Sequence, residues 1–314
     1  MADLLIPDSG SQPRIPPGSN AAAGYKGKYF GRFFFKRPQL GYTLMAGVAA
    51  VFLALFFGYP LLNILKFAIY DDGFTTAHFR EIFFHPQGHY LAVILTTFRV
   101  AAIVTVLTFV LGYPMAGLLL CARKKWQRLF MICIILPFWT SVLVRTYAWM
   151  VLLGRRGLVN TILLQTGMVE QPVNLLFNTT GTIIGMTHIM LPYMIFPLFS
   201  VMQNIDLRLM SAAYTLGAKP RQAFLKIFLP LSLPGIFGGG LLVFIISLGF
   251  FITPALMGGH KDLMMAVLIE RRVMDLLQWG MGAALGLVLL GATLLLVIIV
   301  RRFIGVETLF GGGR

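Results

Sequence analysis

The chain has 314 residues, of which 58% are hydrophobic and only 12% are charged, and its formal net charge is +15. A soluble core of this size cannot hide so much apolar surface, so a soluble domain is excluded and the bilayer must be the main solvent. The positive charge lies in short segments that flank apolar stretches. We therefore assign it to membrane topology and lipid phosphate, and predict no nucleic-acid partner.

The first 38 residues contain no early apolar stretch. They are polar and rich in Pro and Gly, then aromatic and basic from Tyr25 to Arg37. A cleavable signal peptide would need an apolar core there, so we predict a cytosolic tail. The aromatic-basic part suits the membrane interface, and a plain topogenic flank explains it equally well. The predicted organisation is a tail at 1–38, the first transmembrane helix and an outer loop at 39–89, the main transmembrane domain at 90–303 and a cytosolic C-terminal tail at 304–314.

Six apolar stretches are long enough to cross the hydrocarbon core as helices. They lie at roughly 41–65, 91–119, 129–153, 181–203, 231–256 and 281–300. Lys and Arg gather in the N-terminal tail and after the second, fourth and sixth stretches, so we predict that both termini are cytosolic. In the outer stretch 154–180 we expect a short re-entrant or interfacial helix. The sequence thus predicts an all-α membrane protein with six transmembrane helices.

The cytosolic loop between the fourth and fifth spans, residues 204–230, has the pattern of a docking element. Small residues at 211–213 predict a short helix that a partner can approach closely, and Gly217 can end that helix with a positive φ. A second short helix is predicted from Pro220. Its apolar residues share one face at helical spacing: Ala223, Phe224, Ile227 and Phe228. We expect a helix–Gly–helix element that lies parallel to the membrane, immediately inside it.

This loop resembles the coupling loop of permeases from binding-protein-dependent ABC importers. In that family Glu-Ala-Ala is followed, after three residues, by Gly and, after nine more, by Ile-x-Leu-Pro; the matching residues are Ala212, Ala213, Gly217, Ile227, Leu229 and Pro230. Ser211 stands where the family usually has Glu, which implies a weaker or rearranged contact with the ATPase. The resemblance covers about residues 90–300. The runs Leu136–Trp149, Gly157–Thr161 and Ile252–Gly259 are similar to spermidine/putrescine permeases.

The resemblance implies a type I ABC importer permease with cytosolic coupling helices, in the bacterial inner (plasma) membrane. Its expected partners are a second permease of the same fold, in a homodimer or a heterodimer, two ATP-binding subunits, a periplasmic substrate-binding protein and membrane lipid. The chain contains no G-x-x-x-x-G-K-[ST] loop, so we expect no enzyme activity and no cofactor in this chain, with ATP and Mg on the partner ATPase. The residues expected to couple to the ATPase are Ser211, Ala212, Ala213, Gly217, Phe224, Ile227, Leu229 and Pro230.

Polar and aromatic side chains within the spans are candidates for the solute pathway. Polar groups in a membrane are costly and face the protein interior or a wet cavity, and aromatic faces attract organic cations. The candidates are Trp139, Thr140, Ser141, Tyr147, His188, Tyr193, Ser247, Phe250, Phe251 and Thr253. Interhelical packing is the alternative role for part of this set. Arg145 would repel a polycation, so we expect it to be structural, paired with an outer-loop carboxylate or backbone carbonyls.

The resemblance favours a polyamine as the solute. Polyamine permeases carry a Glu in the fifth span before the Pro, whereas this chain has Gly249, Phe250 and Phe251 there. A related amino compound, such as an amino acid derivative or an opine-like molecule, is therefore the alternative. An ion-coupled secondary transporter would need an intramembrane acid, and none of the six spans contains Asp or Glu. A membrane enzyme or metal site would need a cluster of reactive side chains, and the five His residues are scattered.

Overall fold

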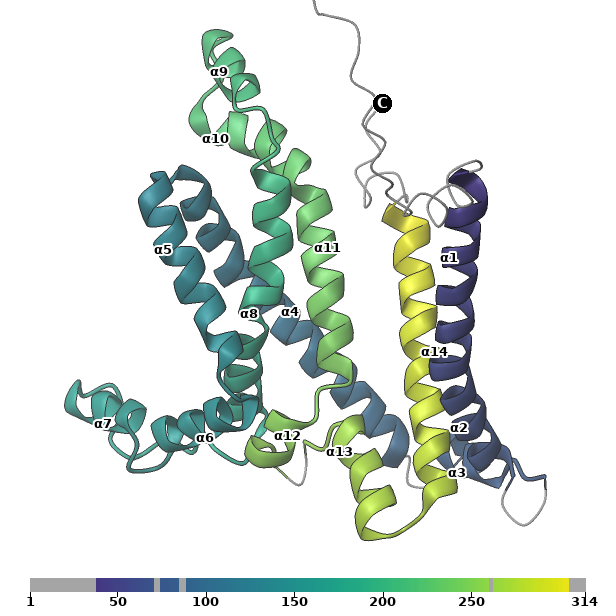
Figure 1. The fold of residues 1–314 in the computed structure, drawn as a ribbon. Helices are drawn as coiled ribbons and strands as arrows, with labels where there is room; N and C mark the ends of the chain where they lie inside the picture. The colour runs from purple at the N-terminus through teal and green to yellow at the C-terminus, as the bar shows by residue number, and fades with distance from the viewer. Residues whose placement is uncertain (1–37, 71–73, 85–88, 260–261, 305–314) are drawn as a thin grey trace, which may run out of the picture. The chain divides into compact units, whose positions relative to one another are not determined.

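The computed structural model describes residues 38–70, 74–84, 89–259 and 262–304 (Figure 1). Of the predicted tails 1–38 and 304–314, residues 1–37 and 305–314 lie outside these ranges. Within them the chain is helical, and its one β-type pairing is an isolated bridge between Tyr70 and Phe74. The chain divides into two units, Met1–Pro60 and Leu61–Arg314, which we describe separately.

In the first unit, α1 (Pro38–Leu53) continues through a π-helical turn (Ala54–Gly58) into α2 (Tyr59–Ile69), most of which belongs to the second unit. The combined helix Tyr42–Ile69 has a mean hydropathy of 2.2. Every residue from Tyr42 to Phe57 is exposed. An all-round apolar helix of this length fits a membrane span whose surface is covered by lipid or by another subunit.

The second unit is a bundle of long helices with shorter ones at its ends. The remaining α-helices are α3 (Ala77–Phe84), α4 (His89–Cys121), α5 (Lys124–Ile135), α6 (Val142–Leu153), α7 (Leu158–Gln165), α8 (Thr179–Met202), α9 (Arg208–Thr215), α10 (Pro220–Ala223), α11 (Leu229–Leu248), α12 (Ile252–Met257), α13 (Met265–Glu270) and α14 (Trp279–Ile304). A 3₁₀ turn (Leu136–Trp139) and two π turns (Phe224–Phe228 and Arg271–Asp275) extend them. Figure 1 places α9 and α10 at one end of the bundle, and α6, α7, α12 and α13 at the other.

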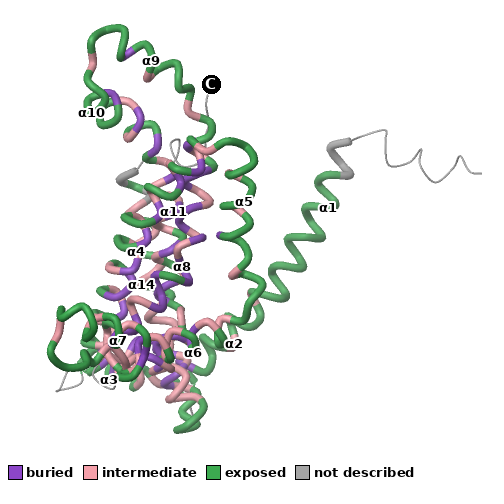
Figure 2. Tube along the Cα trace, turned by 90° about the vertical axis from the view of Figure 1, so that its left-hand side faces the viewer, coloured by how far each residue is buried: buried purple, intermediate pink, exposed green. Residues whose placement is uncertain are grey.

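Helix α8 is the centre of the second unit and packs against both α4 and α11. In its most apolar stretch 61% of the residues are buried, whereas none of the other four long apolar helices exceeds 33%. The purple, buried part of Figure 2 follows these three helices. Met186, Met190 and Met194 of α8 are fully buried in the main core cluster. Methionine fills irregular gaps between helices, which suits a core that joins several helix pairs.

Five of the six predicted spans have long helices, whereas the third is not one straight helix. Five described helices are long and apolar enough to cross a membrane, and the two segments Lys124–Trp139 and Val142–Gln165, bent by 99°, make a sixth if they form one broken span. The bend falls at Thr140 and Ser141, whose backbones are extended. Thr140 closes the preceding turn, because both its N–H and its hydroxyl donate to the carbonyl of Pro137, at 3.1 and 2.7 Å. The prediction of a continuous third span at 129–153 is therefore wrong, because the helix is interrupted at the bend.

The fifth predicted span, 231–256, is also interrupted. Helix α11 ends at Leu248, residues 249–251 are not helical, and α12 begins at Ile252. In the outer stretch 154–180, α7 confirms the expected short helix. The transmembrane region therefore contains two breaks, at 140–141 and 249–251. Both lie at the end of the bundle opposite α9 (Figure 1).

Glycines allow α11 to approach α8 closely. A Cβ at Gly239 would lie 3.0 Å from the sulfur of Met194 and 3.1 Å from its carbonyl oxygen, and a Cβ at Gly235 would lie 3.2 Å from the Cα of Leu198. Small residues at such positions let helix backbones come near enough for van der Waals attraction to hold them together within lipid. The contact between α8 and α11 therefore depends on glycine at these positions.

We predict that Gly239→Leu lowers the free energy of unfolding by roughly 1–3 kcal/mol, because the larger side chain must push α11 away from Met194. Gly238→Leu is the matched control, since a Cβ there meets no atom within 4 Å. The measurement is thermal unfolding of the purified protein in detergent. Equal melting temperatures for the two variants would contradict the close contact.

Candidate coupling loop and translocation pathway

The coupling loop, residues 204–230, begins with α9. Asp206 starts this helix by accepting a 2.9 Å hydrogen bond from the backbone N–H of Arg208. Ser211 and Ala212 are exposed, whereas Ala213 is buried. The two exposed small side chains leave the backbone of α9 accessible at this point.

Gly217 ends α9 in a Schellman motif. Its φ is +83°, its N–H donates to the carbonyl of Tyr214 at 3.0 Å, and the N–H of Ala218 donates to the carbonyl of Ala213 at 3.0 Å. Glycine adopts this left-handed conformation without steric cost. The predicted turn is therefore present. It leaves the side chain of Leu216 beside it 88% exposed.

The second helix of the loop is not separate from the fifth span. It begins at Pro220, after the N–H of Lys219 donates to the side-chain oxygen of Gln222 at 3.0 Å, and it continues without a break to Leu248. At the junction the N–H of Leu229 reaches back five residues to the carbonyl of Phe224. This π turn comes directly before Pro230, whose ring has no N–H and crowds the preceding turn. The structure thus corrects the prediction of an independent second helix parallel to the membrane.

The predicted coupling residues of this second segment differ in exposure. Phe224 and Pro230 are exposed, and Ile227 and Leu229 are partly buried. The loop, the turn between α4 and α5 and the last turns of α14 lie toward the same end of the bundle in Figure 1. They carry nine exposed cationic residues, namely Arg123, Lys124, Lys125, Arg128, Arg208, Lys219, Arg221, Lys226 and Arg302. Among the described residues at that end, Asp206 is the one acid. This end therefore carries a strong positive charge.

Hydrogen bonds and packing join the two transmembrane breaks. Thr146 of α6 and Thr253 of α12 are both fully buried, and their hydroxyl oxygens lie 3.1 Å apart. Helix α12 also packs on α8, where Gly185 accommodates Thr253 and Met257. The chain positions that flank 140–141 and 249–251 are therefore held together although they are about a hundred residues apart in the sequence.

The predicted pathway residues separate into an exposed and a buried group. Trp139, Thr140, Ser141, Tyr147, His188 and Phe251 are exposed, Tyr193 and Phe250 are partly buried, and Ser247 and Thr253 are buried. On the exposed side, the indole N–H of Trp149 donates to Nδ1 of His188 at 3.2 Å, and the rings of Phe138 and Tyr193 are 5.1 Å apart. The exposed members come from the break at 140–141, from α6 and α8, and from the break at 249–251. Ser247 and Thr253 belong to the packing between helices.

Sequence reasoning missed several polar residues of this region. Thr146 and Trp149 were not among the candidates, although each contacts one of them. The hydroxyl of Thr187 on α8 is buried and has no hydrogen-bond partner among the described residues, and the same holds for Ser247. Hydroxyl side chains within an apolar stretch were the available signal, but they are also common in helix packing.

Arg145 is half-buried on α6. Its Nε is buried without a hydrogen-bond partner in the described part of the chain. The structure does not show the expected pairing with an outer-loop carboxylate or with backbone carbonyls among the residues it describes. A guanidinium without a carboxylate at this depth leaves a positive charge uncompensated beside the exposed pathway group.

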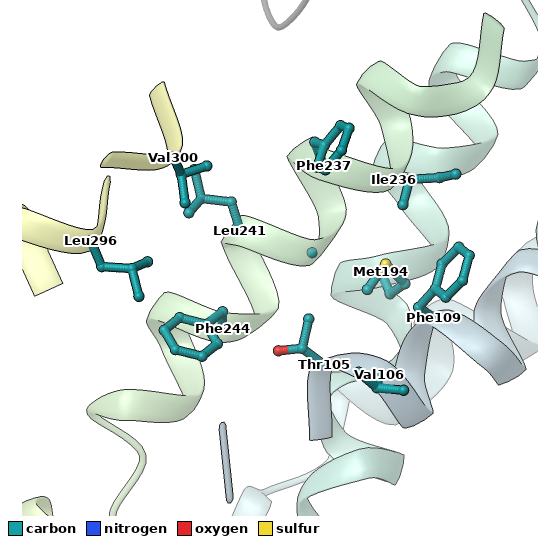
Figure 3. Close-up of a pocket in the computed structure, with 11 residues that line it drawn as sticks. Thr105, Val106, Phe109, Met194, Ile236, Phe237, Leu241, Phe244, Leu296 and Val300 are labelled. Atoms are coloured by element: carbon teal, nitrogen blue, oxygen red, sulfur yellow. The ribbon is translucent and has the colours of Figure 1, made fainter. Parts of the chain in front are cut away.

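An apolar cavity of about 410 Å³ lies between α4, α8, α11 and α14 (Figure 3). Its lining includes Val106, Phe109, Phe244 and Leu296, and its one hydroxyl, on Thr105, donates to the carbonyl of Ala101 at 2.7 Å. An ammonium group would lose its hydration there without gaining a partner. The cavity is therefore unsuited to an amine and suited to hydrocarbon. The described residues also contain no group of three metal-ligating side chains.

Asn160 anchors the outer loop next to these breaks and was singled out only as part of a motif. It is fully buried; its amide donates to the carbonyls of Gly154 and Val173, both at 3.0 Å, and its oxygen accepts from the N–H of Val173 at 2.8 Å. These three bonds tie the segment after α7 to the end of α6.

A helical bundle with a Gly-terminated loop at one end is the architecture expected of an importer permease. The family described as binding-protein-dependent transport system inner membrane component matches residues 108–305, and the chain belongs to this family. It is a multi-pass inner-membrane permease subunit of a binding-protein-dependent ABC importer.

Similar proteins include polyamine permeases. The chain is 37% identical over 200 residues to the spermidine/putrescine transport system permease protein PotB of Escherichia coli (strain K12), covering 64% of this chain and 73% of that one. It is 33% identical over 262 residues to PotB of Haemophilus influenzae, covering 80% and 91%. A bacterial alginate ABC transporter, solved in complex with its pentasaccharide-bound periplasmic protein, shares the fold, with a TM-score of 0.69 at 17% identity over 88% of this chain and 98% of that one.

We predict that Asn160→Ala lowers the free energy of unfolding by roughly 1–3 kcal/mol, because three hydrogen bonds between the buried side chain and the backbone are lost. Amide hydrogen exchange at Val173 should speed up at the same time. The exposed Asn174→Ala is the control and should leave both quantities near wild type. Unchanged exchange at Val173 in Asn160→Ala would contradict the anchoring role.

Proposed function

We propose that this chain is one of two permease subunits through which a polyamine, such as spermidine or putrescine, passes from a periplasmic binding protein to the cytosol. The similarity to spermidine/putrescine permeases over 200 to 262 residues carries this proposal. The exposed aromatic side chains of Trp139, Tyr147 and Phe251 suit an organic cation, because ring faces attract ammonium groups.

The energy comes from two ATPase subunits, which bind ATP and Mg outside this chain and dock on the coupling loop. A partner would contact the accessible backbone around Ser211 and Ala212 and the exposed side chain of Leu216. With Ser211 in place of an acid, the contact at that position is a hydrogen bond rather than an ion pair. The positive end of the bundle faces the cytosol, which puts both termini there.

The exposed breaks support the assignment of the pathway. The segment Lys124–Trp139 has 16 residues and spans about 24 Å, less than the hydrocarbon core of about 30 Å. If Lys124 lies at the interface, the extended backbone at Thr140 and Ser141 is reached inside the membrane. Irregular backbone at that depth is tolerated only against protein or along a water-filled cavity. The exposed residues at this break therefore face the second permease and the route between the two subunits.

The coupling role predicts a sharp difference between two substitutions at Gly217. Asp and Asn both tolerate a positive φ, and a Cβ there meets no atom of this chain within 4 Å, so both should keep the turn. Asp buries a charge in the close contact with the ATPase, which is costly, whereas Asn adds a neutral group of the same size. We expect Gly217→Asp to abolish substrate-stimulated ATP hydrolysis by the reconstituted complex and Gly217→Asn to retain most of it. Wild-type stimulation in Gly217→Asp would count against docking at this turn.

An amino compound that also carries an anionic group, such as an amino acid derivative or opine-like molecule, is the second candidate solute. The uncompensated guanidinium of Arg145 favours it, because a carboxylate would bind that charge and a polycation would be repelled. None of the six predicted spans supplies an acid for a polyamine.

Arg145→Gln separates the two solutes. If the cargo is a polyamine, removal of a repelling charge should maintain or increase uptake of labelled spermidine by membrane vesicles that contain the assembled importer. If the cargo carries a carboxylate, uptake of that cargo should fall several-fold. Arg99→Gln, at an exposed position of α4, controls for the general loss of a positive charge. A fall in spermidine uptake specific to Arg145→Gln would contradict the repulsion argument.

A further inference from the structure

Tyr113 connects α4 to the point where the coupling loop becomes a transmembrane helix. Its ring meets the ring of Phe224 edge to face, with centroids 6.2 Å apart, at the start of the π turn Phe224–Phe228. Its hydroxyl lies 3.0 Å from the hydroxyl of Ser232, just after that turn. One side chain of α4 thus contacts the helix on both sides of the irregular turn.

Two hydrogen bonds involve the hydroxyl of Ser232. This fully buried hydroxyl can donate its single proton to the carbonyl of Leu229 at 2.8 Å. With that proton used, the phenol of Tyr113 donates to Ser232. Because Ser232 keeps its bond to Leu229, loss of the phenol hydroxyl would leave no buried donor without a partner. Ser232 therefore does not need this bond to have a hydrogen-bond partner. The bond's structural effect is to join α4 to α11.

The residues next to Tyr113 place it where α4 contacts α8 and where α4 can bend. A Cβ at Gly112 would lie 3.1 Å from Met194, so the backbone there rests directly on α8. Pro114 lies inside α4 and removes one hydrogen bond from its ladder, which makes the helix easier to bend. On the partner helix the π turn is a second weak point. Two deformable helix positions therefore face each other, linked by Tyr113.

We infer that Tyr113 is the positioning residue that carries movement of the coupling loop to α4 as well as to α11. Displacement of α10 moves Phe224 and, through the continuous helix, Ser232. Both contact Tyr113, so the end of α4 around Pro114 follows, while the contacts of α4 and α11 with Met194 of α8 stay packed. Without this link α4 would receive the movement only through its general packing against α11 and α8. The inference rests on the proposed docking of an ATPase at the coupling loop.

The test is transport per ATP hydrolysed in the reconstituted importer, with Tyr113→Phe and Ser232→Ala. Tyr113→Phe keeps the ring contacts and removes the hydroxyl, and Ser232→Ala removes the acceptor. Each should lower the ratio of solute imported to ATP hydrolysed by roughly 2- to 30-fold, the usual range for residues that couple two sites, with an unchanged melting temperature. The double variant should be no worse than either single variant, because both remove the same bond.

Tyr59→Phe is the matched control, since Tyr59 is exposed and belongs to neither the loop nor the bundle core. It should keep the wild-type ratio. If Tyr113→Phe also keeps the wild-type ratio, or lowers transport and ATP hydrolysis in proportion together with the melting temperature, the inference is overturned. If the wild-type complex itself shows no ATP-driven uptake, the proposed function fails instead. If Tyr113→Phe does not assemble into the importer, the ratio of solute imported to ATP hydrolysed in Ser232→Ala decides the inference by the same criterion.

Discussion

A helix that crosses hydrocarbon must satisfy its backbone hydrogen bonds within itself, and the rest of this structure depends on where the chain departs from that requirement. The ladder is interrupted or altered around Pro114, at the extended residues 140–141, at the π turn 224–228 and at 249–251. Helix α8 carries Pro192 and Pro197 inside its own ladder but stays one continuous helix from Thr179 to Met202. The other departures lie near the junction of the coupling loop or at the opposite end of the bundle.

This arrangement separates a rigid part from a movable part. Helix α8 is buried along most of its length, and glycines on α4 and α11 bring both neighbours against Met194. A close-packed contact of this kind resists continuous deformation and favours a small number of discrete packings. The breaks surround it, so that the helix ends can be repositioned while the centre stays packed. An importer that alternates between two orientations needs both properties in the same bundle.

The positions of the spans and the coupling turn could be predicted, because apolar length and a single glycine with positive φ leave few alternatives. The bend at Thr140 could not. A stretch of apolar residues has the same composition whether it is straight or turns by 99°, and the turn is decided by local bonds from Thr140 to Pro137. The continuity of the helix from Pro220 to Leu248 was missed for a similar reason, since prolines at 230 and 234 favour a boundary in the sequence. In the structure the π turn accommodates the first of them.

The predicted pathway residues could not be assigned from the sequence for another reason. Hydroxyl and aromatic residues serve both helix packing and solute contact, and only burial separates Ser247 from Trp139.

The distribution of charge suggests how selectivity is divided in such an importer. None of the predicted spans contains an acid, and Arg145 is held half-buried without a carboxylate among the described residues. A permease that bound a polyamine tightly through its own carboxylates would have to break those contacts in every cycle, which slows release. Aromatic faces and hydroxyls bind more weakly and let a cation pass. Tight recognition then belongs to the periplasmic binding protein. A positive charge in the permease would hasten the release of a cationic cargo, whereas it would retain an anionic group, so the same guanidinium has opposite consequences for the two candidate solutes.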